Sequence, residues 1–147
     1  MLMQRMTPAL LLGALFTSSA VAQEAQPEAG TIQPPADTLA IGRRATEFFY
    51  NGEIDSLWAM LTPAFQEGLG GPDKLLERLD FLSDRAGTEV DLIEESIRMR
   101  NGRPQYWRVA EFDLAPEPLL IRWVISPEGK VSGQGLGLAS QAPPTDD

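Results

Sequence analysis

The segment EVDLIEESIRMRNGRPQYWRVAEF, from Glu89 to Phe112, carries the clearest structural signals in the sequence. Its centre, Asn101-Gly102, is the strongest short signal for a β-hairpin, because both residues tolerate the positive φ of a type I′ turn. Before the turn, apolar residues alternate with polar ones, and this alternation changes phase midway. Such a change is typical of a β-bulge in a long strand. The stretch therefore predicts an antiparallel hairpin with strands at Glu89–Arg100 and Tyr106–Phe112.

Two more strands follow this hairpin in the sequence. Leu119 to Ile125 is a continuous apolar run that is interrupted only by Arg122. A turn at Pro127–Gly129 then leads into the segment Val131–Leu138. Short strands joined by turns pair with their sequence neighbours in most sheets. We therefore expect an antiparallel meander of four strands.

Three helices are expected before the hairpin, because apolar residues recur there at helical spacing. The first runs from a capping Asp37 to about Asn51, the second from Asp55-Ser56 to Pro63, and the third from Pro72 to Gly87. Helices that precede a run of strands indicate the α+β class. The predicted architecture is three N-terminal helices packed on a bent four-stranded antiparallel sheet.

The last predicted strand carries alternating glycines, Gly133, Gly135 and Gly137. A phosphate-binding glycine loop opens a helix, but a Pro-containing tail follows here, so we expect no nucleotide site. Because residues two apart share a strand face, the three glycines are expected on the same side as Val131. A face of bare backbone permits sheet curvature and close packing, and it equally permits a groove for a ligand or partner. Both interpretations stay open.

The two ends of the chain are predicted to lie outside the folded domain, which spans residues 37–138. Residues 1–22 have the charged, apolar and A-x-A segments of a secretory signal peptide. Residues 23–36 are rich in Pro, Gln and Glu and are expected to form a disordered tether. Residues 139–147 are expected to form a disordered acidic tail. We therefore expect a soluble protein that is exported to the periplasm or out of the cell.

Composition restricts the chemistry of the protein. The sequence contains no cysteine and no histidine, which removes disulfides, thiolate chemistry and Ser-His-Asp triads. Without the signal peptide and its Arg5, the net charge is 11 − 21 = −10. Such a charge repels nucleic acids and anionic lipids, so we expect neither a nucleic-acid partner nor membrane insertion of the mature protein. Asp80 and Asp84 stand one helical turn apart, but cation sites need several converging oxygens, so we expect no metal and no cofactor.

Two segments, ATEFFYNGEIDSLWAMLTPAFQEGL (Ala45–Leu69) and LLIRWVISPEGKVSGQGL (Leu119–Leu136), resemble nuclear transport factor 2-like and ketosteroid isomerase-like proteins. The sequence looks most like a small secreted bacterial family of uncharacterised domains, often found ahead of serine hydrolase domains. This resemblance implies a cone-like fold. Catalytic members place a general-base Asp after the second helix, whereas Leu61–Phe65 has no carboxylate here. Tyr50 offers the aromatic hydroxyl of an oxyanion hole, but no base accompanies it in the sequence.

The remaining candidate binding residues are three tryptophans and one carboxylate. Trp58, Trp107 and Trp123 are expected either in the core or in a platform for a ligand. Glu111 shares a strand face with Trp107, which places it either at the rim of an apolar pocket or in solvent. Arg108 and Arg122 are expected to pair with Glu111 or Asp113 across neighbouring strands.

These observations predict an exported binding domain without catalytic activity. Its first partners to test are a second copy of the chain, pairing through the sheet face, and a small apolar ligand. The candidate contact residues are Tyr50, Trp58, Trp107, Glu111, Trp123, Gly133, Gly135 and Gly137. The alternative is a small isomerase-like or hydrolase-like enzyme that acts on an apolar ligand inside the cone.

Overall fold

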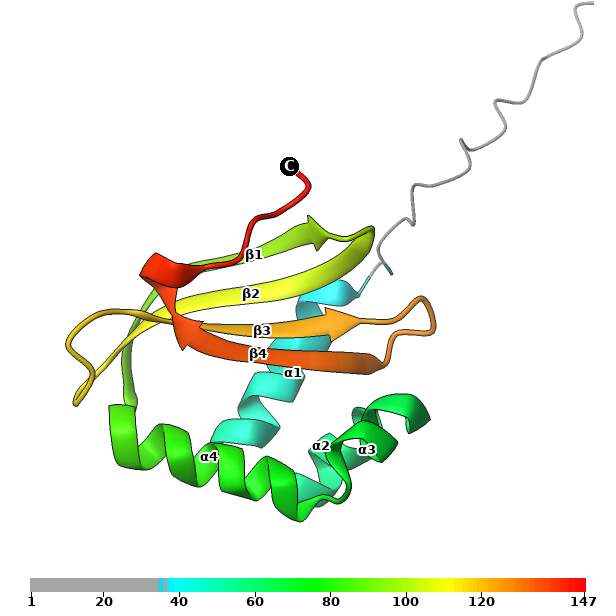
Figure 1. Ribbon diagram of the computed structural model, residues 1–147, viewed down its shortest axis with the longest axis horizontal. Coiled ribbons are helices and arrows are strands. Elements are labelled where there is room, and N and C mark those ends of the chain that lie inside the picture. Colours follow the sequence, from blue (N-terminus) through cyan, green and yellow to red (C-terminus); the bar gives the residue numbers. More distant parts are fainter. Residues whose placement is uncertain (1–34, 36) are drawn as a thin grey trace, which may run out of the picture.

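The computed structural model describes Pro35 and residues 37–147, so the predicted signal peptide and nearly all of the predicted tether lie outside the described residues. The described chain is an α+β domain in which helices lie to one side of an antiparallel sheet (Figure 1). In chain order its elements are α1 (Thr38–Tyr50), α2 (Ile54–Met60), α3 (Pro63–Leu69), α4 (Asp73–Ala86), β1 (Glu89–Arg100), β2 (Arg103–Phe112), β3 (Leu119–Ile125), β4 (Val131–Leu138) and a 3₁₀ helix (Ala139–Gln141).

The predicted hairpin is present with the predicted turn. β1 and β2 pair antiparallel, and the turn residues Asn101 and Gly102 have φ values of 53° and 69°. These values are the left-handed pair that a type I′ turn needs. The register of β1 against β2 shifts between Glu89 and Asp91 and again between Leu92 and Glu94. The change of phase in the sequence therefore corresponds to an irregularity in the pairing of β1 with β2.

The other two strands begin and end at the predicted residues, and the sheet order β1-β2-β3-β4 is the predicted meander. One prediction about β4 is wrong. The pairing shifts between Val124↔Gly133 and Ile125↔Val131, so Ser132 is an extra residue in β4. An extra residue reverses the alternation of side chains between the two faces. Val131 therefore faces the helices, and the three glycines face away from them.

The described chain has four helices in its first half where three were expected. The additional helix, α3, begins at Pro63, the residue that was predicted to end the second helix, and continues to Leu69. Its start is well specified, because the Thr62 hydroxyl accepts a hydrogen bond from the Phe65 N–H at 3.2 Å and Pro63 stands in the first turn. It ends at Gly70, whose φ of 87° is left-handed. At the start of α1, Asp37 makes no side-chain capping bond, contrary to the prediction.

The core lies between the helices and the inner face of the sheet. Its fully buried large side chains come from α1, α2, α4 and the strands, and they include Phe49, Leu57, Leu75, Tyr106, Ile121 and Trp123. Trp123 donates a hydrogen bond from its indole N–H to the Thr46 hydroxyl at 2.9 Å, which ties β3 to α1. At Gly42 the helix backbone approaches the sheet so closely that a Cβ would lie 2.1 Å from Cγ of Tyr106. The packing of α1 on the sheet therefore depends on this glycine.

The C-terminal segment has defined contacts with the sheet, although the sequence predicts a disordered tail. Ala139–Gln141 forms a 3₁₀ turn, and the Asp146 backbone N–H donates to the Met99 carbonyl at 2.8 Å. The Asp146 carboxylate accepts hydrogen bonds from the backbone N–H groups of Asn101 and Gly102 at 3.0 and 2.9 Å. The composition of this segment did not indicate that Asp146 would accept hydrogen bonds from backbone N–H groups that the hairpin turn leaves unpaired.

Candidate binding groove

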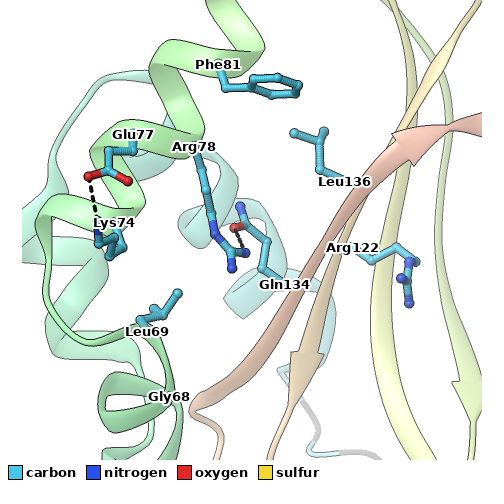
Figure 2. A pocket seen from close by; sticks show the side chains of 10 residues that line it. Gly68, Leu69, Lys74, Glu77, Arg78, Phe81, Arg122, Gln134 and Leu136 are labelled. Carbon is cyan, nitrogen blue, oxygen red and sulfur yellow. Dashed lines mark hydrogen bonds and ion pairs between the residues drawn. The ribbon is translucent and has the colours of Figure 1, made fainter.

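A groove runs between helix α4 and the edge of strand β4 (Figure 2). Its first part has a volume of about 660 Å³ and lies between the end of α3, the first half of α4 and the middle of β4. Its second part, of about 260 Å³, lies between the second half of α4 and the end of β4. Phe81 and Leu136 line both parts, which therefore adjoin. We call the whole the α4–β4 groove, bounded by Lys74–Arg85 on the helix and Gln134–Leu138 on the strand.

The helix side of the groove carries basic and aromatic side chains. The lining residues of α4 include Lys74, Arg78, Phe81 and Arg85. Residues three or four apart lie on the same face of a helix, so these side chains form one stripe. Glu77 is the only acidic side chain among the residues that line the groove, and it is paired with Lys74 Nζ at 2.7 Å. Asp80 and Asp84 of the same helix are not lining residues, so the groove is basic within an acidic protein.

The second part of the groove is apolar. Phe81 keeps 57% of its surface exposed and Leu136 keeps 36%. The guanidinium of Arg85 lies 5.3 Å from the centre of the Phe81 ring, a distance at which a cation is attracted to the ring face. Large exposed apolar side chains that line a groove are typical of contact surfaces. The groove thus combines a basic part with an apolar part.

The strand side of the groove is a sheet edge that is covered at one end only. Thr62 donates its backbone N–H to the Val131 carbonyl at 2.8 Å, and Leu61 forms a parallel bridge with Val131. Beyond that point, within the part of the chain that the structure describes, the backbone of Gly133–Leu138 is hydrogen-bonded to β3 alone. β4 contains no charged residue and no proline, which are the usual means of protecting an edge strand.

Among the residues that the structure describes, one side-chain hydrogen bond crosses the groove. Arg78 donates to the Gln134 side-chain oxygen at 3.0 Å, as Figure 2 shows. The Gln134 side-chain nitrogen is buried and has no hydrogen-bond partner among the described residues. A hydrogen-bond acceptor of a bound partner that displaces Arg78 from Gln134 would therefore meet two donors, the Arg78 guanidinium on α4 and the Gln134 side-chain nitrogen on β4.

The glycines of β4 make room for an arginine on the outer face of the sheet. A Cβ on Gly135 would lie 2.3 Å from a terminal nitrogen of Arg122, so the guanidinium rests directly over this glycine. A Cβ on Gly133 would lie 3.2 Å from the Val124 side chain, whereas a Cβ on Gly137 would meet no other part of the described chain within 4 Å, its two neighbouring residues apart. Of the two interpretations of these glycines, close packing therefore applies at Gly135.

The outer face of the sheet is centred on Trp107. Its ring centre lies 5.4 Å from the Arg98 guanidinium and 5.7 Å from that of Arg122. Gln105 accepts hydrogen bonds from Arg122 at 2.9 Å and from the Trp107 indole N–H at 3.3 Å. Burial and the positive charge of Arg100 lower the pKa of Arg122. Trp107 is thus buried beneath arginine side chains on the face that was expected to pair with a second subunit.

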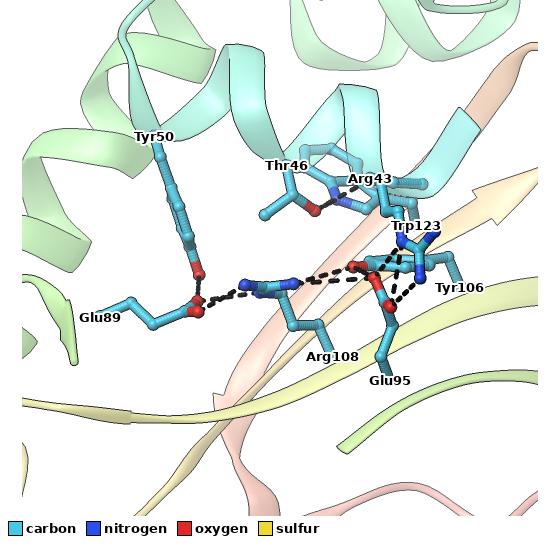
Figure 3. Close-up of polar contacts among 9 residues, drawn as sticks. Arg43, Thr46, Tyr50, Glu89, Glu95, Tyr106, Arg108 and Trp123 are labelled. Carbon is cyan, nitrogen blue, oxygen red and sulfur yellow. Dashed lines mark hydrogen bonds and ion pairs between the residues drawn. The ribbon is translucent and has the colours of Figure 1, made fainter. Parts of the chain in front are cut away.

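A second polar cluster lies between α1 and the first two strands (Figure 3). It consists of Arg43 and Tyr50 from α1, Glu89 and Glu95 from β1, and Tyr106 and Arg108 from β2. Glu89 accepts from the Tyr50 hydroxyl at 2.7 Å and from Arg108 Nε at 2.9 Å. Glu95 accepts from the Tyr106 hydroxyl at 2.7 Å and from Arg43 Nε at 2.9 Å. Glu89 is therefore paired with one arginine and one tyrosine, whereas Glu95 is paired with Tyr106 and with two arginines, Arg43 and Arg108, the latter at 3.7 Å.

The protonation of this cluster follows from burial and pairing. Burial raises the pKa of Tyr50 well above its ordinary value, and the hydrogen bond to Glu89 adds to the rise. The hydrogen bond from Arg43 lowers the pKa of Glu95. Tyr50 therefore stays protonated at neutral pH and Glu95 stays ionised. A pocket of about 400 Å³ adjoins Tyr50, Glu89 and Arg108.

The predicted site residues do not meet at one place. Trp123 is fully buried in the core, and Trp58 is half-buried against it. Trp107 lies on the outer face, where Glu111 is exposed to solvent. The expected pairing of Arg108 with Glu111 or Asp113 is wrong, because Arg108 faces the helices and binds Glu89. Tyr50, for which the sequence offered no partner, binds the same carboxylate.

Neither the basic stripe of α4 nor the acidic partner of Tyr50 was predicted from the sequence. The stripe has a signal in the sequence, since Lys74, Arg78, Phe81 and Arg85 follow the spacing of one helix face. The position of that face beside the edge of β4 is a tertiary feature, and no local pattern indicates it. Glu89 lies 39 residues from Tyr50, so its role depended on the register of β1.

No group of three or more potential metal-ligating side chains occurs among the residues that the structure describes. None of the helices in the described ranges is long and apolar enough to cross a membrane. Comparison with known proteins yields no match to a protein-family model and no significant similarity to a curated protein or a solved structure. The resemblance to nuclear transport factor 2-like proteins and their cone-like shape therefore stays a prediction.

Proposed function

We propose that this protein is an exported, non-catalytic binding domain and that it binds its partner in the α4–β4 groove. The observation that carries the proposal is the position of a basic and apolar groove directly beside a strand edge that, among the described residues, has no backbone partner other than β3 from Gly133 to Leu138. Grooves that combine apolar side chains with a few polar groups are the usual places for ligands. The exposed Phe81 supplies an aromatic anchor of the kind that contributes strongly to protein interfaces.

The polar cluster beneath α1 supports a role in binding over a role in catalysis. A general base works best with a pKa near the operating pH and with a free position for the proton that it accepts. In the cluster, Glu95 is held ionised by Arg43, and Tyr50 is held protonated by burial and by Glu89. These groups stabilise one another through direct hydrogen bonds and ion pairs.

The groove hypothesis is tested by selecting random peptides on the mature protein and mapping their binding site with variants. Phe81 and Leu76 both lie on α4 and are 57% and 45% exposed, but only Phe81 lines the groove. We expect the selected peptides to lose binding to Phe81→Asp and to keep binding to the matched control Leu76→Asp. If every selected peptide binds the Phe81→Asp protein as well as the unmodified one, the groove is not the binding site.

A small enzyme is the second candidate function, and one observation favours it. The pocket beside Tyr50, Glu89 and Arg108 places a phenol, a carboxylate and a guanidinium around one space. Turnover of small apolar esters and ketones by the mature protein tests this candidate. Turnover that is present in the unmodified protein and abolished in Tyr50→Phe would overturn the non-catalytic proposal. The same assay on Glu111→Gln examines the other predicted titratable residue.

Self-association through the sheet face is the remaining partner prediction. Light scattering over a range of concentrations, on the unmodified protein and on Gly135→Glu, measures it directly. The substitution introduces a charged side chain where Arg122 now rests, so an interface on this face would be disrupted. A monomer at all concentrations in both proteins would exclude this partner and would leave the groove hypothesis unaffected.

A further inference from the structure

We infer that the occupant of the α4–β4 groove is an extended peptide with an acidic half and an apolar half, which adds to β4 as a fifth strand. This inference rests on the proposed binding function of the groove and goes further by naming the chemistry and the conformation of the partner. Three features carry it: the hydrogen-bonding capacity of the strand edge, the charge of the lining residues and the order of the two parts along β4.

The first feature is the uncovered edge. An edge strand presents a row of unpaired N–H and C=O groups that an extended peptide can pair with. The contact between Thr62 and Val131 shows that this edge already accepts a neighbouring backbone at its first residue. From Gly133 to Leu138 the described chain provides no backbone partner on that side. Six residues of strand offer room for a peptide of similar length, at about 3.3 Å per residue.

The second feature is charge. The charged side chains that line the groove from α4 are Lys74, Glu77, Arg78 and Arg85. Three of them are cations and one is an anion, whereas the whole chain has a net charge of −9. A positive groove in a negative protein attracts acidic segments and repels basic ones. Arg78 donates a hydrogen bond to Gln134 across the groove, and the carboxylate of a bound peptide would compete for this donor.

The third feature is the order of the two parts. The basic part lies beside Gln134–Leu136 and the apolar part beside Leu136–Leu138. A strand that adds to this edge directs every second side chain toward α4. Its groove-facing side chains therefore need to be acidic at one end and apolar at the other. The apolar end would rest against Phe81 and Leu136, the two exposed side chains that the parts share.

The binding experiment uses eight-residue peptides with three acidic residues in one half and three leucines or valines in the other, synthesised in both orders. A matched peptide carries lysine in place of each acidic residue, and another carries N-methyl groups on alternate backbone nitrogens. We expect one order of the acidic peptide to bind the mature protein. We expect lysine substitution to weaken binding at least about tenfold through charge repulsion. We expect N-methylation to weaken it by a similar factor through lost backbone hydrogen bonds.

Protein variants show where the peptide binds and separate the apolar from the electrostatic contribution to its affinity. We expect Phe81→Ala to weaken binding about tenfold through lost apolar contact. We expect Arg78→Gln to weaken it about two- to fivefold and to reduce its sensitivity to salt. The controls are Leu76→Ala on the same helix and Arg103→Gln beside the β1–β2 turn, neither of which lines the groove. Both are expected to bind within about twofold of the unmodified protein. Amide hydrogen exchange in Gly133–Leu138 is expected to slow when the peptide is bound.

The outcomes distinguish this inference from the proposed function on which it rests. Equal binding of the lysine peptide would overturn the acidic partner, and equal binding of the N-methylated peptide would overturn strand addition. Absence of binding by both orders of the acidic peptide would overturn the inference as a whole. Dimerisation that Phe81→Ala abolishes and Leu76→Ala preserves would assign the groove to a second copy and would also overturn it. In each of these cases the binding function of the groove is still decided by the Phe81→Asp selection experiment.

Discussion

Gly42 and Gly68 are both helix glycines, but replacing them with alanine is expected to have opposite effects. At Gly42, a Cβ would lie 2.1 Å from Cγ and 2.4 Å from Cβ of Tyr106. Tyr106 is fully buried and its hydroxyl is held by Glu95, so its ring has no free space into which to turn. At Gly68, in α3, the rest of the described chain, apart from the adjoining residues and the backbone of the helix itself, has no atom within 4 Å of the position that a Cβ would take.

The expected changes in the free energy of unfolding follow from two opposing contributions, helix propensity and overpacking of the core. Alanine is favoured over glycine in a helix interior by about 1 kcal/mol, which applies to both substitutions. Overpacking a rigid core costs about 1–3 kcal/mol, and the short contacts at Gly42 place it at the upper end of this range. We therefore expect Gly42→Ala to lower the free energy of unfolding by about 2 kcal/mol and the melting temperature by about 10 °C. We expect Gly68→Ala to raise the free energy of unfolding by about 0.5–1 kcal/mol.

Urea unfolding followed by circular dichroism, together with calorimetry of the same proteins, measures both changes. The comparison is internal, because the two variants make the same chemical change in two helices of one molecule. A Gly42→Ala protein as stable as the unmodified one would show that α1 does not depend on this close approach. Equal losses of stability in both variants would show that the contact with Tyr106 does not determine the effect of the substitution at Gly42.

Three further predictions concern the outer face, the pH dependence of stability and the mature N-terminus. Gly135→Ala is expected to displace the Arg122 guanidinium at a cost below about 1 kcal/mol, because a flexible side chain gives way easily, and NMR signals of the arginine Nε groups report the movement. The pKa of Glu95 is lowered in the folded state, so this carboxylate stabilises the fold fully at pH values above its ordinary pKa of 4.5, and the stabilisation is lost as the pH falls below that value. Unfolding measured from pH 6 to pH 3 should therefore show a smaller loss of stability in Glu95→Gln than in the unmodified protein. N-terminal sequencing of the protein exported by its host is expected to begin at Gln23, and a retained Met1 would contradict the predicted signal peptide.

The sheet could be predicted from the sequence to a large extent because its signals are local. The alternation of side chains in β1, the Asn101-Gly102 turn and the apolar run of β3 all depend on neighbouring residues, and the structure contains each of them. Helix α3 also has local signals, in Thr62, Pro63 and Gly70. The proline was interpreted as the end of the preceding helix and as a candidate start of the next turn, but no full helix was predicted after it. A proline in the first turn of a helix is as well tolerated as one just after a helix.

The candidate site could not be predicted, because it depends on how distant elements meet. The alternation in β4 placed Val131 with the glycines, and one extra residue at Ser132 reversed that assignment. The pairing of Tyr50 with Glu89 required the register of two elements relative to each other. The groove exists because α4 lies beside a particular edge of the sheet, and the sequence of α4 indicates only which of its faces is basic.

The attachment of the C-terminal segment to the β1–β2 turn bears on how the protein is best immobilised for affinity measurements. A tag joined after Asp147 leaves the molecule near the β1 edge of the sheet, where Asp146 binds the backbone of the turn. The α4–β4 groove opens along β4, which is the opposite edge of the same sheet (Figure 1). A sensor surface that holds the protein by such a tag therefore presents the groove to the solution. Signals lost upon substitution of Phe81 would then report contacts within the groove, without interference from blocked access.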